Sequence, residues 1–269
     1  MHDTATNTSP LDTRALASRL FYPRPEATRP PHAPGQDLII PLDDGCSLGA
    51  RFHPADDAAP TLLFFHGNGE IVSDYDDLGP LFNRAGIHFL PVDYRGYGRS
   101  SGRPSASSLV RDCHSVLDFA HDWLAEHGFG GRIAVAGRSL GSVPALELAA
   151  SRPEEIIALV VESGFARTRP LLWALGLNPD RDGITEADGF RNLDKIGSYM
   201  GPTLIIHGQR DRLIPPSNAQ KLFDASASAD RTLLFLPEAD HNTVFANGFD
   251  AYLAAVVKLL GATPATDSP

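Results

Sequence analysis

Residues 133–141 read Ile-Ala-Val-Ala-Gly-Arg-Ser-Leu-Gly: an apolar strand pattern runs directly into Gly137-Arg138-Ser139-Leu140-Gly141, and a helical pattern follows at once. A serine on so sharp a turn has a strained backbone, and glycines flank it because side chains there would collide with the strand and the helix. The turn exposes the serine hydroxyl at a sheet edge and directs the first helical amides toward the group it attacks. Ser139 is therefore the candidate nucleophile.

The same pattern occurs a second time, as Gly98-Arg99-Ser100-Ser101-Gly102, so the motif alone is not specific. Here the preceding strand pattern already ends at Val92, and no helical pattern begins until about Leu109. A nucleophile elbow needs the strand, the turn and the helix in immediate succession. The context favours Ser139 over Ser100.

Outward from the elbow, short apolar runs alternate with longer helical patterns. The strand candidates are 38–42, 46–52, 61–65, 88–92, 133–136, 158–161, 203–206 and 232–236, and the helix candidates are 13–20, 77–85, 109–126, 140–150, 218–225 and 249–260. The first two strands flank an Asp-Asp-Gly turn and predict an antiparallel hairpin. The remaining alternation predicts an α/β fold: a mostly parallel central sheet of about eight strands, with helices on both faces.

Composition divides the chain into a core and three appended segments. Residues 1–36 form a proline-rich arm, residues 37–163 and 202–262 the core, and residues 263–269 a flexible tail. Residues 164–201 separate two strands by more than one crossover helix requires, which predicts a short cap insertion over the carboxyl edge. The alternative is an extra surface helix whose leucines dock on the core.

Charge and apolar patterning exclude several classes of protein. With 33 acidic against 23 basic residues the net charge is −10, so no basic surface for nucleic acid is expected. The apolar runs are far shorter than the ~20 residues that cross a bilayer, and the first thirty positions lack a secretion core. We therefore expect a cytoplasmic protein without stable membrane insertion. Cys46 and Cys113 lie far apart, so neither a disulfide framework nor a metal site is expected.

A serine hydroxyl needs a base to take its proton and an acid to orient that base. Asp211 follows the strand candidate 203–206, and His241 follows 232–236, so both fall at the carboxyl edge. The order Ser139, Asp211, His241 is the one that a nucleophile-elbow hydrolase requires. Asp240 is the alternative acid, although the carboxylate of a residue rarely turns back to the ring nitrogen of the histidine that directly follows it. His207 is expected to brace its own loop.

Two backbone amides are needed to stabilise the oxyanion. Leu140 directly follows the nucleophile, and Asn68 lies in the glycine-bearing segment His66-Gly67-Asn68-Gly69-Glu70 after the strand candidate 61–65. An ordinary glycine turn is the alternative reading of that segment. Candidate substrate contacts are Glu70, Phe165 and Trp173.

These motifs together resemble the α/β-hydrolase superfamily from Asp37 to Leu260. The segments that carry the resemblance are 66–69, 93–100, 137–141, 205–211 and 240–242. As a set they are similar to the Bem46-like branch, which includes depalmitoylases of the α/β-hydrolase domain 17 type, and to serine aminopeptidase S33-type hydrolases. The resemblance implies a Ser139, Asp211, His241 triad, an oxyanion hole at Asn68 and Leu140, no cofactor, and structural roles for Asp93 and Arg95.

The expected activity is serine hydrolysis of carboxylic esters with small to medium acyl or aryl groups through an acyl-enzyme. Acyl thioesters are the main alternative substrate, followed by amides or peptides, and a non-catalytic scaffold is the alternative outside enzymes. The arm has no cysteine before Cys46, so lipid-anchored depalmitoylation is not implied. The expected partner is a small-molecule ester or thioester; the natural substrate and the oligomeric state stay open.

Overall fold

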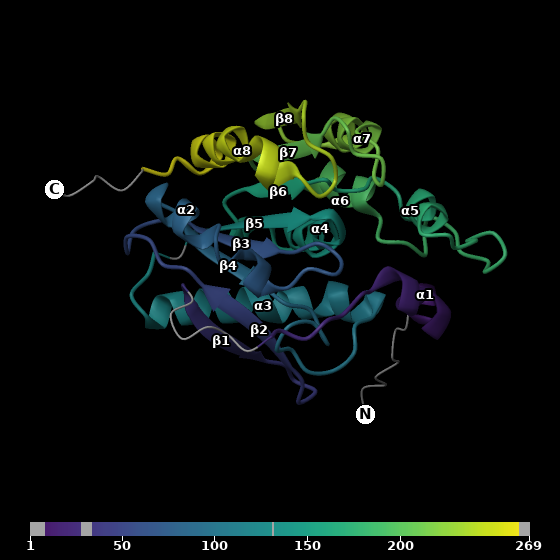
Figure 1. Cartoon of the computed structure of the whole chain (residues 1–269), viewed down its shortest axis with the longest axis horizontal. Coiled ribbons are helices and arrows are strands. Elements are labelled where there is room, and N and C mark those ends of the chain that lie inside the picture. The colour runs from purple at the N-terminus through teal and green to yellow at the C-terminus, as the bar shows by residue number, and fades with distance from the viewer. Residues whose placement is uncertain (1–8, 28–33, 131, 264–269) are drawn as a thin grey trace.

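The computed structural model describes residues 9–27, 34–130 and 132–263, and it is built on one eight-stranded sheet (Figure 1). The strands are β1 Gln36–Pro41, β2 Ser47–Phe52, β3 Thr61–Phe65, β4 His88–Val92, β5 Ile133–Arg138, β6 Leu159–Glu162, β7 Thr203–Gly208 and β8 Arg231–Leu236. Their order across the sheet is β1-β2-β4-β3-β5-β6-β7-β8. Strands β1 and β2 form the predicted antiparallel hairpin, β2 pairs antiparallel with β4, and the others are parallel.

Helices cover both faces of the sheet, as expected for parallel strands joined by crossovers (Figure 1). They are α1 Arg14–Leu20, α2 Gly79–Arg84, α3 Ala106–Glu126, α4 Ser142–Ser151, α5 Thr168–Ala174, α6 Asn192–Ser198, α7 Ser217–Ala225 and α8 Val244–Leu260. In the ranges that the structure describes, no helix is both long and apolar enough to span a bilayer. The predicted α/β fold class is confirmed.

Alternation along the central strands divides the core between the two faces. In β3, Leu63 and Phe65 pack with the side chains of α3, α4, α6 and α7, whereas Leu62 and Phe64 pack with those of α2 and α8. All four side chains are buried, because the strand is covered on both sides. The continuous apolar run in the sequence is the result of this double coverage.

Residues 164–201 divide into two parts. Helix α5 lies away from the sheet, at the same end of the molecule as α1 (Figure 1). Helix α6 packs against α4 and α7, its Ile196 is fully buried, and Lys195 forms an ion pair with Glu147 of α4 at 2.7 Å. The α5 part thus overhangs the carboxyl edge, while α6 serves as a crossover helix of the core.

The proline-rich arm is packed against the core in its described part. Leu11, Leu16, Leu20 and Phe21 are buried in and around α1, so the segment contributes to the main apolar cluster. The backbone N–H of Tyr22 then donates to Asn68 Oδ1 at 2.8 Å. Residues 1–8 and 28–33 of the predicted arm, and 264–269 of the predicted flexible tail, lie outside the described residues.

Candidate active site

The turn at Ser139 requires glycine at the two flanking positions of the motif, 137 and 141. Ser139 lies between β5 and α4 with a φ of 52°, in the left-handed region that side chains rarely adopt. A Cβ on Gly137 would lie 2.1 Å from the carbonyl oxygen of Gly141, and a Cβ on Gly141 would lie 2.0 Å from that of Phe65. Strand, turn and helix therefore pack too closely for any other residue at these two positions.

The structure brings the three sequence-predicted polar side chains into one hydrogen-bonded chain. His241 Nε2 lies 3.0 Å from Ser139 Oγ, and His241 Nδ1 lies 2.7 Å from Asp211 Oδ2. The serine follows β5, the aspartate follows β7 and the histidine follows β8, so parallel pairing delivers all three to one edge. All three are buried, at 8% exposure or less. The geometry allows the imidazole to accept the serine proton.

Asp211 is held in its ionised form by its surroundings. Its Oδ1 accepts hydrogen bonds from the backbone N–H groups of Leu213 and Ile214 at 2.9 and 2.8 Å, and its Oδ2 lies 3.2 Å from His207 Nε2. Burial alone would raise the pKa of Asp211, but the hydrogen bonds to His207 and His241 outweigh it and lower the pKa well below the ordinary aspartate value. A permanent carboxylate orients the imidazole and stabilises its protonated form.

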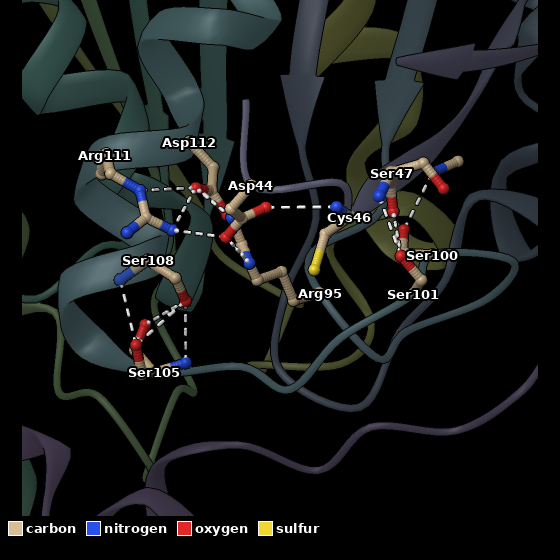
Figure 2. A network of polar contacts seen from close by, with 11 residues as sticks. Asp44, Cys46, Ser47, Arg95, Ser100, Ser101, Ser105, Ser108, Arg111 and Asp112 are labelled. Atoms are coloured by element: carbon tan, nitrogen blue, oxygen red, sulfur yellow. Dashed lines mark hydrogen bonds and ion pairs between the residues drawn. The ribbon is translucent and has the colours of Figure 1, made fainter. Parts of the chain in front are cut away.

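The alternative acid and the alternative serine are both occupied elsewhere. The Asp240 carboxylate accepts from the backbone N–H of Asn242 at 2.9 Å and from the hydroxyl of Thr243 at 2.8 Å, which closes its own turn. Ser100 Oγ accepts from the backbone N–H of Gly49 at 2.8 Å, within the polar loop that Figure 2 shows. Neither contributes to the chain around His241.

His207, His114 and His121 have partners outside the Ser139–His241 pair. His207 Nε2 donates to the carbonyl oxygen of Ile214 at 2.7 Å and so braces the Asp211 loop. On α3, His114 faces Glu147 at 3.5 Å and His121 faces Glu155 at 4.0 Å. Across the residues described here, no group of three or more His, Cys, Asp or Glu side chains could hold a metal ion.

Arg138, the variable position of the elbow motif, links three segments that surround the site. Its Nη2 donates to the carbonyl oxygen of His241, its Nη1 to Glu162 Oε1 and its Nε to Glu70 Oε1, each at 2.8 Å. The guanidinium is buried, and its planar set of donors suits three acceptors in different directions. Sequence reasoning missed this residue; its one signal was an arginine at the end of a strand buried on both faces.

Glu70 holds the segment after β3 in place. Its Oε2 accepts from the backbone N–H of Gly67 at 2.6 Å and from the hydroxyl of Tyr75 at 2.5 Å, while Oε1 faces Arg138. Burial would raise the pKa of Glu70, but the charge of Arg138 and the Tyr75 hydrogen bond lower it below the ordinary glutamate value. Glu70 lines the cavity as predicted, yet both carboxylate oxygens are engaged by protein groups, so its observed contacts are those of a residue that fixes this loop.

Asn68 and Leu140 both line the cavity in front of Ser139. Asn68 Oδ1 accepts from the N–H of Tyr22 and the hydroxyl of Tyr97, at 2.8 and 2.7 Å, so the side chain is turned toward the arm. Within the described ranges the backbone N–H of Asn68 donates no hydrogen bond. The arm thus fixes Asn68 and leaves its amide N–H for a ligand.

The cavity at Ser139 has a volume of about 150 Å³ and mostly apolar walls. Phe165 lines it as predicted, whereas the Trp173 side chain is 49% exposed and is not part of the wall. The other apolar walls are Leu20, Leu171, Leu175, Leu213 and Ile214. Leu20 comes from α1, so the arm supplies part of the cavity.

The fold and the site define an α/β-hydrolase: a mostly parallel sheet with an elbow serine after β5 and a histidine after β8. The sequence matches the family model described as serine aminopeptidase S33 over residues 56–179 and 190–247, which is more than half of the chain. The chain therefore belongs to this hydrolase family. The unmatched residues 180–189 lie between α5 and α6.

Individual relatives agree with this placement. The chain is 29% identical to protein bem46 of Schizosaccharomyces pombe over 209 residues, or 74% of this chain and 67% of that protein. It is 33% identical to human alpha/beta hydrolase domain-containing protein 17B over 207 residues, or 74% and 63%. The structure of the Pyrococcus furiosus esterase Pf2001 shares the fold with a TM-score of 0.72 at 19% identity, over 90% of this chain and 98% of that one. The resemblance to the Bem46-like branch is confirmed.

Proposed function

We propose that this protein is a serine hydrolase that cleaves carboxylic esters of small to medium acyl or aryl groups through an acyl-enzyme. The observation that carries the proposal is the chain from Ser139 through His241 to Asp211, at the wall of an apolar cavity. A serine hydroxyl becomes an effective nucleophile only beside such a base. Membership of a hydrolase family supports the same reaction class.

In the first half-reaction, Ser139 Oγ attacks the ester carbonyl carbon while His241 Nε2 takes the hydroxyl proton. The negative charge moves to the carbonyl oxygen, where the backbone N–H groups of Leu140 and Asn68 stabilise it. Removing one donor of this kind costs about 3 kcal/mol in enzymes of this class. The tetrahedral intermediate then collapses, the imidazolium protonates the departing alkoxide, and the acyl group stays on Ser139.

The second half-reaction repeats these steps with water. His241 accepts a proton from a water molecule that attacks the acyl carbon, and the same two amides stabilise the second oxyanion. Collapse returns the proton to Ser139 and releases the carboxylic acid. Arg138 and Glu70 contribute by position, since one binds the His241 carbonyl and the other the Gly67 amide.

The cavity supports the size class of the substrate. An apolar cavity of about 150 Å³ is known to accommodate a benzene-sized group. With Leu20, Leu171 and Leu175 among its walls, the cavity at Ser139 suits an aryl ring or a short aliphatic acyl chain. Long acyl chains exceed the volume of this cavity.

A fluorophosphonate probe tests the nucleophile directly, because it phosphonylates only an activated serine. We expect labelling of the wild type, with the adduct on the peptide that contains Ser139. Ser139→Ala should abolish labelling and Ser100→Ala should retain it. Labelling that survives Ser139→Ala, or folded wild type that is never labelled, would refute the proposal.

A substrate panel tests the reaction class. Phenyl esters and thioesters of acetate, butyrate, octanoate and palmitate, with the matching anilides, are compared by kcat/KM. We expect esters to be cleaved faster than anilides, with an optimum at or below eight carbons. Preference for palmitate, for thioesters or for anilides would contradict the proposed substrate class while leaving the nucleophile in place.

A further inference from the structure

A second hollow adjoins the cavity at Ser139. Its volume is about 330 Å³, and it shares four wall residues with that cavity: Phe165, Leu171, Leu213 and Ile214. Its other walls come from the start of α5, the loop after Asp211 and the start of α7. The two spaces therefore lie next to each other along these shared walls.

Three cationic side chains line this second hollow: Arg167, Arg212 and Lys221. No carboxylate is among its lining residues, although the whole chain carries 33 acidic residues against 23 basic ones. In the described part of the chain, none of the three cations forms an ion pair. The hollow is therefore lined by three exposed cations whose donors are free of carboxylate partners in the described residues.

The other cations near the site differ from these three. Arg138 is neutralised by Glu70 and Glu162, and Arg169 of α5 is paired with Asp180. The start of α7 adds partial positive charge to the hollow, because Ser217 and Asn218 line it and a helix carries such charge at its N-terminus. Arginine and lysine with free donors are the usual partners of carboxylate and phosphate groups.

We propose that this hollow, the cationic groove, binds an anionic group, a carboxylate or a phosphate, on the part of the ester that extends beyond the apolar cavity. The inference rests on the proposed ester hydrolysis and deepens it by naming a substrate class: esters with an apolar acyl group and an anionic alcohol portion. The groove is open to solvent, so its attraction for the anion weakens as salt is added.

Three butyrate esters test the groove, formed with 4-hydroxybenzamide, 4-hydroxybenzoate and 4-hydroxyphenyl phosphate. The first is neutral, and the other two place a carboxylate or a phosphate at the para position of the same ring. For wild type we expect kcat/KM to be at least tenfold higher for one or both anionic esters than for the neutral one, mainly through a lower KM. The two anionic esters distinguish the carboxylate from the phosphate.

The double variant Arg167→Gln/Lys221→Gln removes two cations without altering the residue next to Asp211. We expect it to lower the ratio of anionic to neutral kcat/KM at least fivefold, and the ratio cancels any general loss of activity. Arg84→Gln is the matched control, since Arg84 is an exposed arginine on α2 outside both cavities, and its ratio should equal that of wild type.

The outcomes separate this inference from the proposed function. If wild type hydrolyses none of the three esters, the proposed function fails. If it hydrolyses all three with ratios near one, or if the double variant keeps the wild-type ratio, the groove assignment is wrong and ester hydrolysis stands. A preference for anionic esters that falls in the double variant and in 0.5 M salt supports both.

Discussion

Two segments of this protein share the pattern Gly-Arg-Ser-x-Gly and differ in everything that surrounds it. In 137–141 the serine has a φ of 52° and lies 3.0 Å from an imidazole nitrogen. In 98–102 the serine hydroxyl accepts a backbone N–H, and its neighbours Ser101, Ser47 and Cys46 belong to a polar loop network (Figure 2). The same residues thus form a strand-to-helix elbow beside an imidazole in one place and a hydrogen-bonded loop in the other.

The glycines and arginines of the two segments show why. Gly137 is required by the carbonyl of Gly141, whereas a Cβ on Gly98 would meet the Asp93 carboxylate, which accepts a hydrogen bond from the backbone N–H of Val72. Arg138 is buried, while Arg99 is one-third exposed and pairs with Asp37. The motif fixes which residues form the turn. The strand before it and the helix after it determine whether the serine hydroxyl lies next to a histidine.

The largest difference is expected in catalysis. Ser139→Ala should lower kcat for butyrate esters by at least about 10⁴-fold, because a catalytic serine cannot be replaced by the rest of its triad. Ser100→Ala should keep kcat within about threefold, because it removes one loop hydrogen bond. Steady-state kinetics of the two variants measure this, with circular dichroism as the control for folding. A similar loss in both variants would remove the distinction between the segments.

The two arginines should differ in stability. Arg138→Gln leaves Glu70 and Glu162 without their common cation, and breaking a buried pair costs about 3–5 kcal/mol. Arg99→Gln removes ion pairs of a partly exposed side chain, for which about 1 kcal/mol or less is expected. Urea unfolding of both variants gives the free energies of unfolding. Equal losses would mean that the Arg138 network is as solvent-screened as that of Arg99.

Much of the elbow could be predicted from sequence because its requirements are local. Continuous apolar runs, glycines on both sides of Ser139 and a helical pattern directly after it follow from sterics within one stretch of chain. The placement of Asp211 and His241 required one further step, that parallel strands end at the same edge. The eight-stranded α/β fold followed from the same periodicities.

Contacts made by distant segments could not be predicted in this way. Nothing local in the proline-rich arm indicated that Leu20 would line the cavity or that Tyr22 would bind Asn68. Trp173 is a candidate substrate contact only because its side chain is aromatic. A seven-residue helix such as α5 is too short for its sequence pattern to show which face is buried. The partners of Arg138 come from the loop after β3, the end of β6 and the loop after β8, so they depended on the packing of three distant segments.

Ser139 has a histidine base beside it and Ser100 does not, so only the reactivity of Ser139 should depend on the protonation of His241. An imidazolium cannot accept the Ser139 proton, so fluorophosphonate labelling of Ser139 should slow as the pH is lowered from 8 to 5. Asp211 cannot cause this loss, because hydrogen bonds keep its pKa below the ordinary aspartate value and it stays ionised throughout. The rate of labelling at each pH measures the effect in enzyme kept folded over the range. A flat profile would exclude His241 as the base.

The smallest difference concerns the carboxylates beside each segment. The pKa of Glu70 is lowered in the folded protein, so its stabilisation is fully present above about pH 4.5, the ordinary glutamate value, and is lost as the pH falls below it. Glu70→Gln should therefore cost about 1.5–2 kcal/mol at pH 7, within the range of a hydrogen bond to a charged group, and less as the pH falls toward 3. Urea unfolding at each pH measures the cost.

Asp44, which pairs with Arg95 beside the second segment (Figure 2), is the matched control. The Arg95 hydrogen bond lowers its pKa to about 2, so Asp44→Asn also loses its effect in acid. This carboxylate is exposed, however, and its effect should vanish in 0.5 M salt at pH 7, whereas that of Glu70→Gln should persist because buried pairs are screened far less. If salt removed the effect of both variants, solvent would reach the segment that contains Glu70 and Asn68. The two Gly-Arg-Ser-x-Gly segments would then differ in geometry but not in electrostatics.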